Sequence, residues 1–284
     1  MISWSGPLAI SSIQRQNEQK SDALLAAQCR ARRTMSSASL AKLALDIPSA
    51  ATANEPTELE KLLGSHLDAV LSAAVDLSSV DKLAAKLFAA LTAEARLLKS
   101  SPLSSHTADL YVLQHETLPA AIGSTLAGKI CSGAFPGSSA EQLQATTTSF
   151  RSTLVDVLSR PRIVSSVLAD LAKALATDPA TQGLLQPIFF LKGFQALTTY
   201  RVAHALWAEG SACNASAALL LQSRGSELWD VDIHPGAIIG DGVMLDHACG
   251  IVIGSTAIVG NDVYVRFDYM PPRQRCVLPR AAAR

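Results

Sequence analysis

The chain has 284 residues, and its 24 Lys and Arg balance its 24 Asp and Glu, so the formal net charge at pH 7 is zero. This neutrality argues against a protein that binds nucleic acid or an anionic membrane by bulk electrostatics. Hydrophobic residues make up 49% and charged residues 17%, which is typical of a folded globular protein. No apolar stretch reaches the roughly 18–20 residues that would cross a bilayer, so we expect no membrane partner.

The cysteines indicate the redox compartment. They are odd in number, show no C-x-x-C spacing, and lie at Cys29, Cys131, Cys213, Cys249 and Cys276. This pattern argues against a disulfide scaffold and a structural zinc site, and it favours a reducing compartment. We therefore expect a soluble intracellular protein without a bound metal or cofactor.

Residues 1–50 differ in composition from the rest of the chain. They are basic, rich in Ser and poor in acidic residues, which is typical of an organelle transit peptide. A disordered extension has the same composition, so both interpretations stay open. The first favours a plastid or mitochondrion over the cytoplasm.

Residues 51–230 are expected to form an all-helical domain, because aliphatic residues recur at helical spacing. The pattern is clearest over 80–91, 164–175 and 191–206, and Gly210 is placed to end the third of these helices. The segment 132–139 contains Gly, Ser and Pro, and it is predicted to be a loop between two helices.

From residue 231 the hydrophobic period changes to six. The first run is Ile233, Ile239, Leu245 and Ile251, and a second run follows a two-residue slip with Ile253, Val259 and Val265. A six-residue aliphatic period predicts a parallel β-helix over 231–265, with one inward side chain in each short strand. A few short antiparallel strands are the alternative. The fold class is therefore α+β.

Several strings of residues carry a family resemblance. They lie at 191–197, 200–204, 231–235, 245–248 and 253–263. Together they resemble the serine acetyltransferase (serine O-acetyltransferase) family, which carries out the first step of cysteine biosynthesis from serine. The resemblance implies a helical N-terminal domain, a left-handed parallel β-helix, and acetyl-CoA as the donor for L-serine. It also implies a trimer-based hexamer and association with O-acetylserine (thiol) lyase.

Two residues match the family's catalytic pair. His247 matches the histidine that acts as general base, and Asp232 matches the carboxylate that steadies the imidazole. Asp232 faces outward next to Ile233 and lies close to one coil before His247, so we expect the two side chains to meet on neighbouring coils. Because His247 comes two residues after the inward Leu245, a corner has to turn it outward.

Two further carboxylates match those with which the family holds the substrate amino acid, Asp178 and Asp246. Asp178 has an alternative role as the N-cap of a helix that begins at Pro179. We expect structural roles at the remaining candidates, as a turn residue, a helix-packing residue and a small buried hydrophobe: His234, His204 and Cys249. No phosphate-binding or dinucleotide motif is present.

The resemblance stops after Val263. In the family this point is followed by a Gly-rich stretch, an Arg-His pair that helps to bind substrate, CoA-binding coils and a C-terminal tail that docks the lyase. Residues 266–284 have no six-residue period, and they contain five Arg and one Asp. We therefore expect a truncated β-helix that exposes its apolar end, an incomplete acetyl-CoA site and little or no acetyltransferase activity.

Two functions compete on this basis. The first is a serine O-acetyltransferase with His247 as base. The second is a catalytically incomplete module that joins intact copies through its helical domain and regulates them. A gene-model artefact, from a frameshift or an alternative exon near Val263, is a third reading of the same break.

Overall fold

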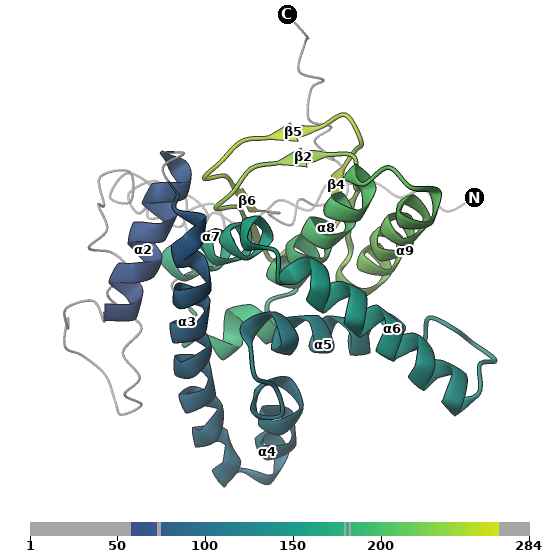
Figure 1. The fold of residues 1–284 in the computed structure, drawn as a ribbon, viewed down its shortest axis with the longest axis horizontal. Coiled ribbons are helices and arrows are strands. Elements are labelled where there is room, and N and C mark those ends of the chain that lie inside the picture. The colour runs from purple at the N-terminus through teal and green to yellow at the C-terminus, as the bar shows by residue number, and fades with distance from the viewer. Residues whose placement is uncertain (1–57, 73–74, 179, 182, 267–284) are drawn as a thin grey trace, which may run out of the picture. The chain divides into compact units, whose positions relative to one another are not determined.

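A computed structural model describes residues 58–72, 75–178, 180–181 and 183–266 of the chain, and these belong to one compact unit. In this part of the chain helices come first and short strands follow (Figure 1). The predicted leader over 1–50 lies outside the described residues, and so does the predicted basic tail 266–284 except for Arg266, which belongs to the last described strand instead of the tail. None of the helices in the described ranges is long and apolar enough to span a membrane.

The helices account for the described chain from residue 58 to residue 229. Their bounds are α2 Glu58–Leu71, α3 Leu77–Leu97, η2 Leu98–Ser100, α4 Pro102–Ala108, η3 Asp109–Leu113, α5 Leu118–Cys131, α6 Ala140–Leu158, α7 Pro161–Thr177, η4 Gln186–Phe190, α8 Lys192–Ala208 and α9 Ala212–Trp229. The loop predicted over 132–139 joins α5 to α6 and is confirmed. Gly210 follows the end of α8 with φ +73°, as its predicted role as a helix terminator requires.

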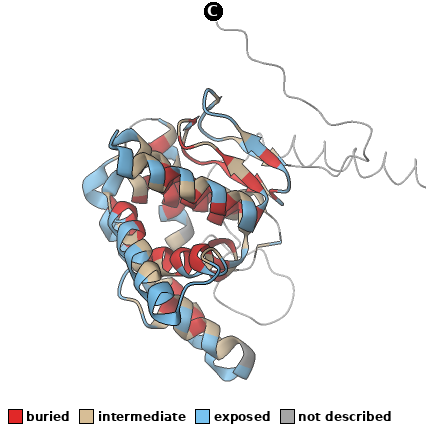
Figure 2. Cartoon of the chain, turned by 90° about the vertical axis from the view of Figure 1, so that its right-hand side faces the viewer, coloured by how far each residue is buried: buried red, intermediate tan, exposed pale blue. Residues whose placement is uncertain are grey.

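Buried faces of these helices meet in a continuous core (Figure 2). On α3 the fully buried side chains include Val80, Leu87 and Leu91, which lie on one face at helical spacing, as predicted. α8 differs from the expected amphipathic helix, because every residue from Gly193 to Ala203 is buried. The reason is its position, since it packs against α7, α9, β1 and β3 at the same time.

Six short strands follow α9: β1 Val231–Ile233, β2 Ile238–Ile239, β3 Met244–Asp246, β4 Ile251–Ile253, β5 Ile258–Val259 and β6 Tyr264–Arg266. They pair in parallel as β1 with β4, β2 with β5 and β3 with β6. The described strands thus form two stacked turns of a three-sided parallel β-helix, and the antiparallel alternative is wrong.

The register corrects the predicted coil length. Ile233 lies beside Ile253 and Leu245 beside Val265, so one coil takes twenty residues and not the eighteen of three hexads. The three corners 234–237, 240–243 and 247–250 have four residues each, so the two additional residues belong to β1 and β3, which have three residues where β2 has two. Ile251 consequently pairs with Val231 and is not the next member of the column that contains Ile233.

The inside of the β-helix is better covered in the first coil than in the second. Ile233, Ile239 and Leu245 are 4%, 9% and 2% exposed, whereas Ile253, Val259 and Val265 are only half-buried. The difference arises because each inward side chain of the second coil has a stacked neighbour on one side only, within the residues that the structure describes.

Close backbone packing fixes β3 on the helical part. A Cβ atom added at Gly193, in the first turn of α8, would lie 1.9 Å from the carbonyl oxygen of Leu245. Only glycine allows the helix to approach the strand this closely. The strand that leads into the corner at His247 is therefore seated directly on α8.

Candidate active site

The corner 247–250 carries the predicted general base. His247 and Ala248 have φ values of +55° and +43°, and Gly250 has +66°, so the chain leaves the extended conformation as soon as β3 ends. The side chain of His247 is 69% exposed. The expectation that a corner turns this ring outward is confirmed, and the left-handed backbone conformation of His247 is the local reason for it.

Asp246 lies beside this imidazole. Its carboxylate is mostly buried, with 15% of the side chain exposed, and its Oδ1 atom lies 3.8 Å from Nε2 of His247. Its other oxygen accepts a hydrogen bond from the hydroxyl of Tyr264 and lies 3.9 Å from Nε of Arg266. The corner after β3 and strand β6 thus surround one carboxylate with an imidazole, a phenol and a guanidinium.

Tyr264 stays a neutral hydrogen-bond donor over the physiological range. Burial, followed by its hydrogen bond to Asp246, raises the pKa of the phenol well above its ordinary value. The negative charge of Asp178 adds to this effect, which places Asp178 within electrostatic range of the same hydroxyl. Asp178 and Asp246 were both expected to bind the substrate amino acid, and both raise the pKa of the Tyr264 phenol.

Asp178 corrects one local expectation. It is the residue that ends α7, with φ −92° and ψ +106°, and not the N-cap of a following helix. Its Oδ1 accepts a hydrogen bond of 2.9 Å from the amide of Ala180, and Ala180 and Thr181 are not helical. The side chain therefore shapes the turn after α7 instead of opening a helix.

Asp232 does not contact His247. It lies on β1, and its Oδ1 accepts a hydrogen bond of 2.7 Å from Nε2 of Gln222 on α9. Among the described residues, no hydrogen bond or ion pair joins this carboxylate to the imidazole. The expectation that the two side chains meet assumed a coil of eighteen residues, whereas a coil takes twenty. His247 lies in the corner after β3, and Asp232 lies in the middle of β1.

Three other residues can be compared with their predicted roles. His234 accepts a hydrogen bond of 2.9 Å from the amide of Gly236, as a turn residue would. His204 donates to the carbonyl of Pro235 over 2.7 Å, which agrees with a packed helix residue. The prediction for Cys249 is wrong, because it is exposed; it lies in the same corner as His247, and Nζ of Lys192 approaches its sulfur to 3.1 Å.

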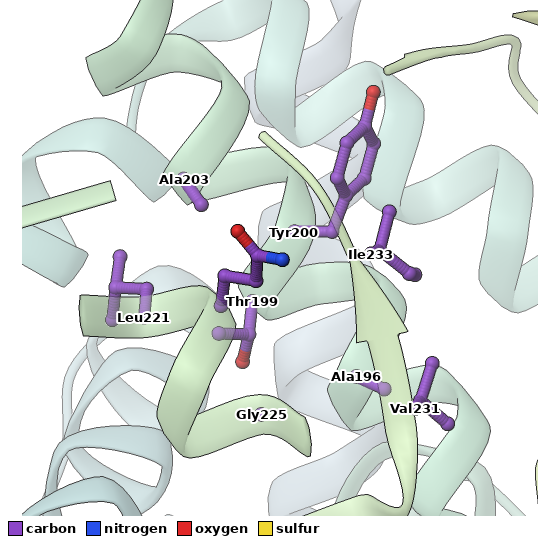
Figure 3. A pocket seen from close by; sticks show the side chains of 9 residues that line it. Ala196, Thr199, Tyr200, Ala203, Leu221, Gly225, Val231 and Ile233 are labelled. Atoms are coloured by element: carbon purple, nitrogen blue, oxygen red, sulfur yellow. The ribbon is translucent and has the colours of Figure 1, made fainter. Parts of the chain in front are cut away.

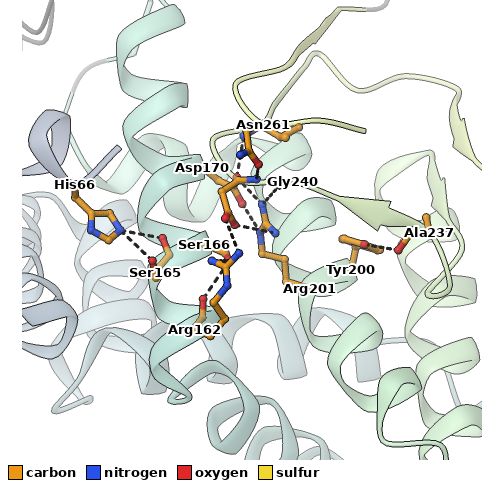
Figure 4. Close-up of polar contacts among 12 residues, drawn as sticks. His66, Arg162, Ser165, Ser166, Asp170, Tyr200, Arg201, Ala237, Gly240 and Asn261 are labelled. Carbon is orange, nitrogen blue, oxygen red and sulfur yellow. Dashed lines mark hydrogen bonds and ion pairs between the residues drawn. The ribbon is translucent and has the colours of Figure 1, made fainter. Parts of the chain in front are cut away.

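A buried polar network connects the helices to the β-helix, and the sequence pattern did not reveal it (Figure 4). Arg201 on α8 donates to both carboxylate oxygens of Asp170 on α7, and also to the carbonyl of Gly240. Asp170 in turn accepts from the amide of Val243, directly before β3. The partners are 31 to 73 residues apart in the chain, so no local spacing pattern could have predicted the network.

Asp241 extends this network to the surface. Its carboxylate accepts a hydrogen bond of 2.6 Å from Arg162 and lies 3.8 Å from Nη1 of Arg201. Burial opposes the charge of Asp241, but the contacts with Arg162, Ser166 and Arg201 outweigh it and hold the pKa of this carboxyl below its ordinary value. The corner before β3 is thus fixed by charged groups on two helices.

A small pocket lies between α8, α9 and β1 (Figure 3). It has room for about one water molecule, and the side chain of Thr199 on its wall has a buried hydroxyl without a hydrogen-bond partner. It is too small for an amino acid or a nucleotide cofactor. A metal site is not indicated either, because the described residues contain no group of three or more His, Cys, Asp or Glu that could hold an ion.

Comparisons with known proteins agree with this arrangement. Residues 87–199 match the model of the family described as "Serine acetyltransferase, N-terminal". A solved structure described as serine acetyltransferase in complex with CoA is 32% identical, with a TM-score of 0.57, over 64% of this chain and 73% of that one. The chain belongs to the serine acetyltransferase family.

Two further serine acetyltransferases show how far the similarity extends. The soybean enzyme complexed with serine is 32% identical, with a TM-score of 0.57, over 64% of this chain and 71% of that one. Probable serine acetyltransferase 4 of Oryza sativa subsp. japonica is 43% identical over 155 residues, which are 54% of this chain and 45% of the rice protein. The chain spans 42% to 60% of the length of curated relatives that it matches.

Proposed function

We propose that the chain is a serine O-acetyltransferase, which transfers the acetyl group of acetyl-CoA to the hydroxyl of L-serine. The observation that carries this proposal is the exposed imidazole of His247 beside the mostly buried carboxylate of Asp246, on a corner of the β-helix. Family members with bound CoA and with bound serine support the choice of donor and acceptor.

The chemistry needs a base, because a serine hydroxyl is a poor nucleophile near pH 7. In the proposed reaction His247 takes the hydroxyl proton while the serine oxygen attacks the carbonyl carbon of the thioester. The imidazolium then returns the proton to the sulfur of CoA as the carbon–sulfur bond breaks. General-base help of this kind typically contributes about 10²- to 10⁴-fold in rate.

The other residues of the proposed site are carboxylates. We assign Asp178 and Asp246 to the ammonium group of serine, since Asp246 accepts a hydrogen bond from the hydroxyl of Tyr264 and the charge of Asp178 also raises the pKa of that phenol. Asp232 is retained as the carboxylate that steadies the imidazolium. This role comes from the family resemblance; in the structure the carboxylate accepts a hydrogen bond from Gln222.

The assembly and the location of the protein also belong to the proposal. Outward aliphatic side chains are strongly exposed on two sides of the β-helix: Ile238 by 56% and Ile258 by 77% on the β2–β5 side, and Val252 by 71% on the β1–β4 side. Exposed apolar side chains of this kind favour a homo-oligomer through the outer sides of the β-helix, up to the trimer-based hexamer that the resemblance implies. Association with O-acetylserine (thiol) lyase, and a plastid or mitochondrial location from the leader, stay predictions of the sequence.

The test is release of CoA thiol from acetyl-CoA in the presence of L-serine, with His247→Ala as the control. We expect thiol release that depends on serine and that disappears in the variant. The same assay measures the rate, which we expect to be low because the resemblance to the family stops after Val263. Failure to release thiol and to bind serine would contradict the proposal. In that case a change in size or activity of an intact homologue, mixed with this chain, would favour the regulatory module instead.

A further inference from the structure

The neighbours of Asp246 on strand β6 suggest an addition to the amino-acid site. Asp246 and Arg266 are direct partners in the β3–β6 register, and Tyr264 lies one position further along the same face. Leu245 and Val265 between them point into the β-helix, as part of its core. The outer side of β6 therefore places a phenol and a guanidinium next to one carboxylate.

The chemistry of an α-amino acid requires both charges near each other. Its ammonium and carboxylate groups are attached to the same carbon atom, so a cation within a few ångströms of Asp246 is well placed to bind the carboxylate of an amino acid whose ammonium group lies on Asp246. Nε of Arg266 lies 3.9 Å from Oδ2 of Asp246. A guanidinium has five N–H donors in a planar fork, so it can face Asp246 on one edge and a substrate carboxylate on another.

A second cation stands at the same corner and has to be distinguished from Arg266. Nζ of Lys192 lies 3.1 Å from the sulfur of Cys249, and among the described residues it forms no ion pair with a carboxylate of the site. Arg266, by contrast, is the direct strand neighbour of Asp246. The register therefore favours Arg266 as the group that a zwitterion bound on Asp246 would meet.

We infer that Arg266 binds the α-carboxylate of the substrate amino acid, and that Tyr264 is a positioning residue that holds Asp246 for the ammonium group. This inference rests on the proposed function, since it takes L-serine as the substrate. It assigns Arg266 to the carboxylate end of L-serine and Tyr264, through Asp246, to the ammonium end. The two roles lead to different outcomes when one end of the ligand is removed.

The experiment measures binding to the full chain by isothermal titration calorimetry, without acetyl-CoA. The probes are L-serine and ethanolamine, which keeps the ammonium and hydroxyl groups but lacks the carboxylate. For Arg266→Gln we expect serine binding to weaken by about ten- to a hundredfold, as for loss of a charge-assisted hydrogen bond, and ethanolamine binding to stay within about threefold. For Tyr264→Phe we expect both ligands to weaken by a similar factor.

Two control variants make the result specific. Arg266→Lys keeps the charge and is expected to restore part of the preference for serine over ethanolamine. Lys192→Gln removes a positive charge at the same corner and is expected to leave that preference intact. The thermal unfolding midpoint of each variant, without ligand, separates weaker binding from loss of the fold.

The outcomes separate the inference from the proposed function. If the unaltered chain binds serine and Arg266→Gln keeps the preference for serine, or if Lys192→Gln abolishes that preference, the role of Arg266 is wrong while the proposed function stands. If Tyr264→Phe leaves the binding of both ligands unchanged, the role of Tyr264 is wrong. If the unaltered chain binds neither ligand, the proposed function fails as well.

Discussion

The guanidinium of Arg201 on α8 donates hydrogen bonds of 2.5 and 2.7 Å to the two carboxylate oxygens of Asp170 on α7. Both side chains are almost completely buried, with 6% and 1% exposed. Through the carbonyl of Gly240 and the amide of Val243, the same pair reaches the first coil of the β-helix. One ion pair thus connects two helices to the strand that leads to His247.

Removal of one partner of this pair should be costly. We expect Arg201→Met to lower the free energy of unfolding by about 3–5 kcal/mol, because it leaves the carboxylate of Asp170 buried without its counter-charge. Urea unfolding at pH 7 measures the difference. The control is Arg160→Met, which breaks exposed pairs with Glu209 (41% and 37% exposed) and with Asp156, and should cost about 1 kcal/mol or less. Equal losses in the two variants would contradict the central role of the buried pair.

The contact of α8 with β3 makes a second prediction. Gly193→Ala is expected to destabilise the protein and to reduce activity, because its Cβ would lie 1.9 Å from the carbonyl oxygen of Leu245 and would push β3 away. In Gly128→Ala, on α5, the added Cβ meets nothing within 4 Å, so this control should stabilise by about 0.5–1 kcal/mol. Thermal unfolding and the thiol-release assay measure the two effects. A Gly193→Ala protein as stable and active as Gly128→Ala would show that the close approach is unimportant.

Asp241 should give the network a dependence on pH. Its pKa is lower in the fold than in the unfolded chain, so its ionised form stabilises the protein above the unfolded pKa, near 4, and this stabilisation is lost as the pH falls through the folded pKa. We expect Asp241→Asn to be less stable than the unaltered chain at pH 7 and at pH 5, with the difference shrinking below about pH 4. Chemical unfolding at several pH values measures it, and a difference that grows on acidification would reverse the assignment.

The roles of the two carboxylates around His247 can be separated by kinetics. If Asp232 steadies the imidazolium, Asp232→Asn should lower kcat by about 10²- to 10⁴-fold with little change in KM for serine. If Asp246 holds the ammonium group, Asp246→Asn should mainly raise KM for serine. The opposite assignment follows if Asp246→Asn lowers kcat and Asp232→Asn has little effect, since it is Asp246 that lies 3.8 Å from the imidazole here.

Much of the fold could be predicted from the sequence, because its signals are periodic. The helical spacing of Val80, Leu87 and Leu91 predicts a helix face that packs against a core, and the six-residue period of aliphatic residues predicts stacked strands. α8 could not be predicted in the same way. It is buried on all sides, so a pattern of one apolar face understates how many elements surround it.

The sequence predicted which residues belong to the candidate site, but it did not predict most of the contacts between their side chains. The outward turn of His247 followed from counting inward positions, since alternation without a corner would have buried it. The neighbours of Asp246 did not follow, because Tyr264 and Arg266 come from the next coil and become its partners only through a register of twenty residues. The missed contact between Asp232 and His247 has the same origin, since an error of two residues in the coil moves a side chain to a different edge.

The corner 247–250 carries the proposed base but takes no part in the pairing of the strands. The ladders of the three faces are formed by residues 231–233, 238–239 and 244–246 with their partners, so no rung depends on the side chain of His247. A substitution at that position should therefore leave the scaffold standing, and a new reactive group could be introduced there without redesigning the solenoid. Loss of reactivity at this corner and loss of folding are, in this architecture, separable events.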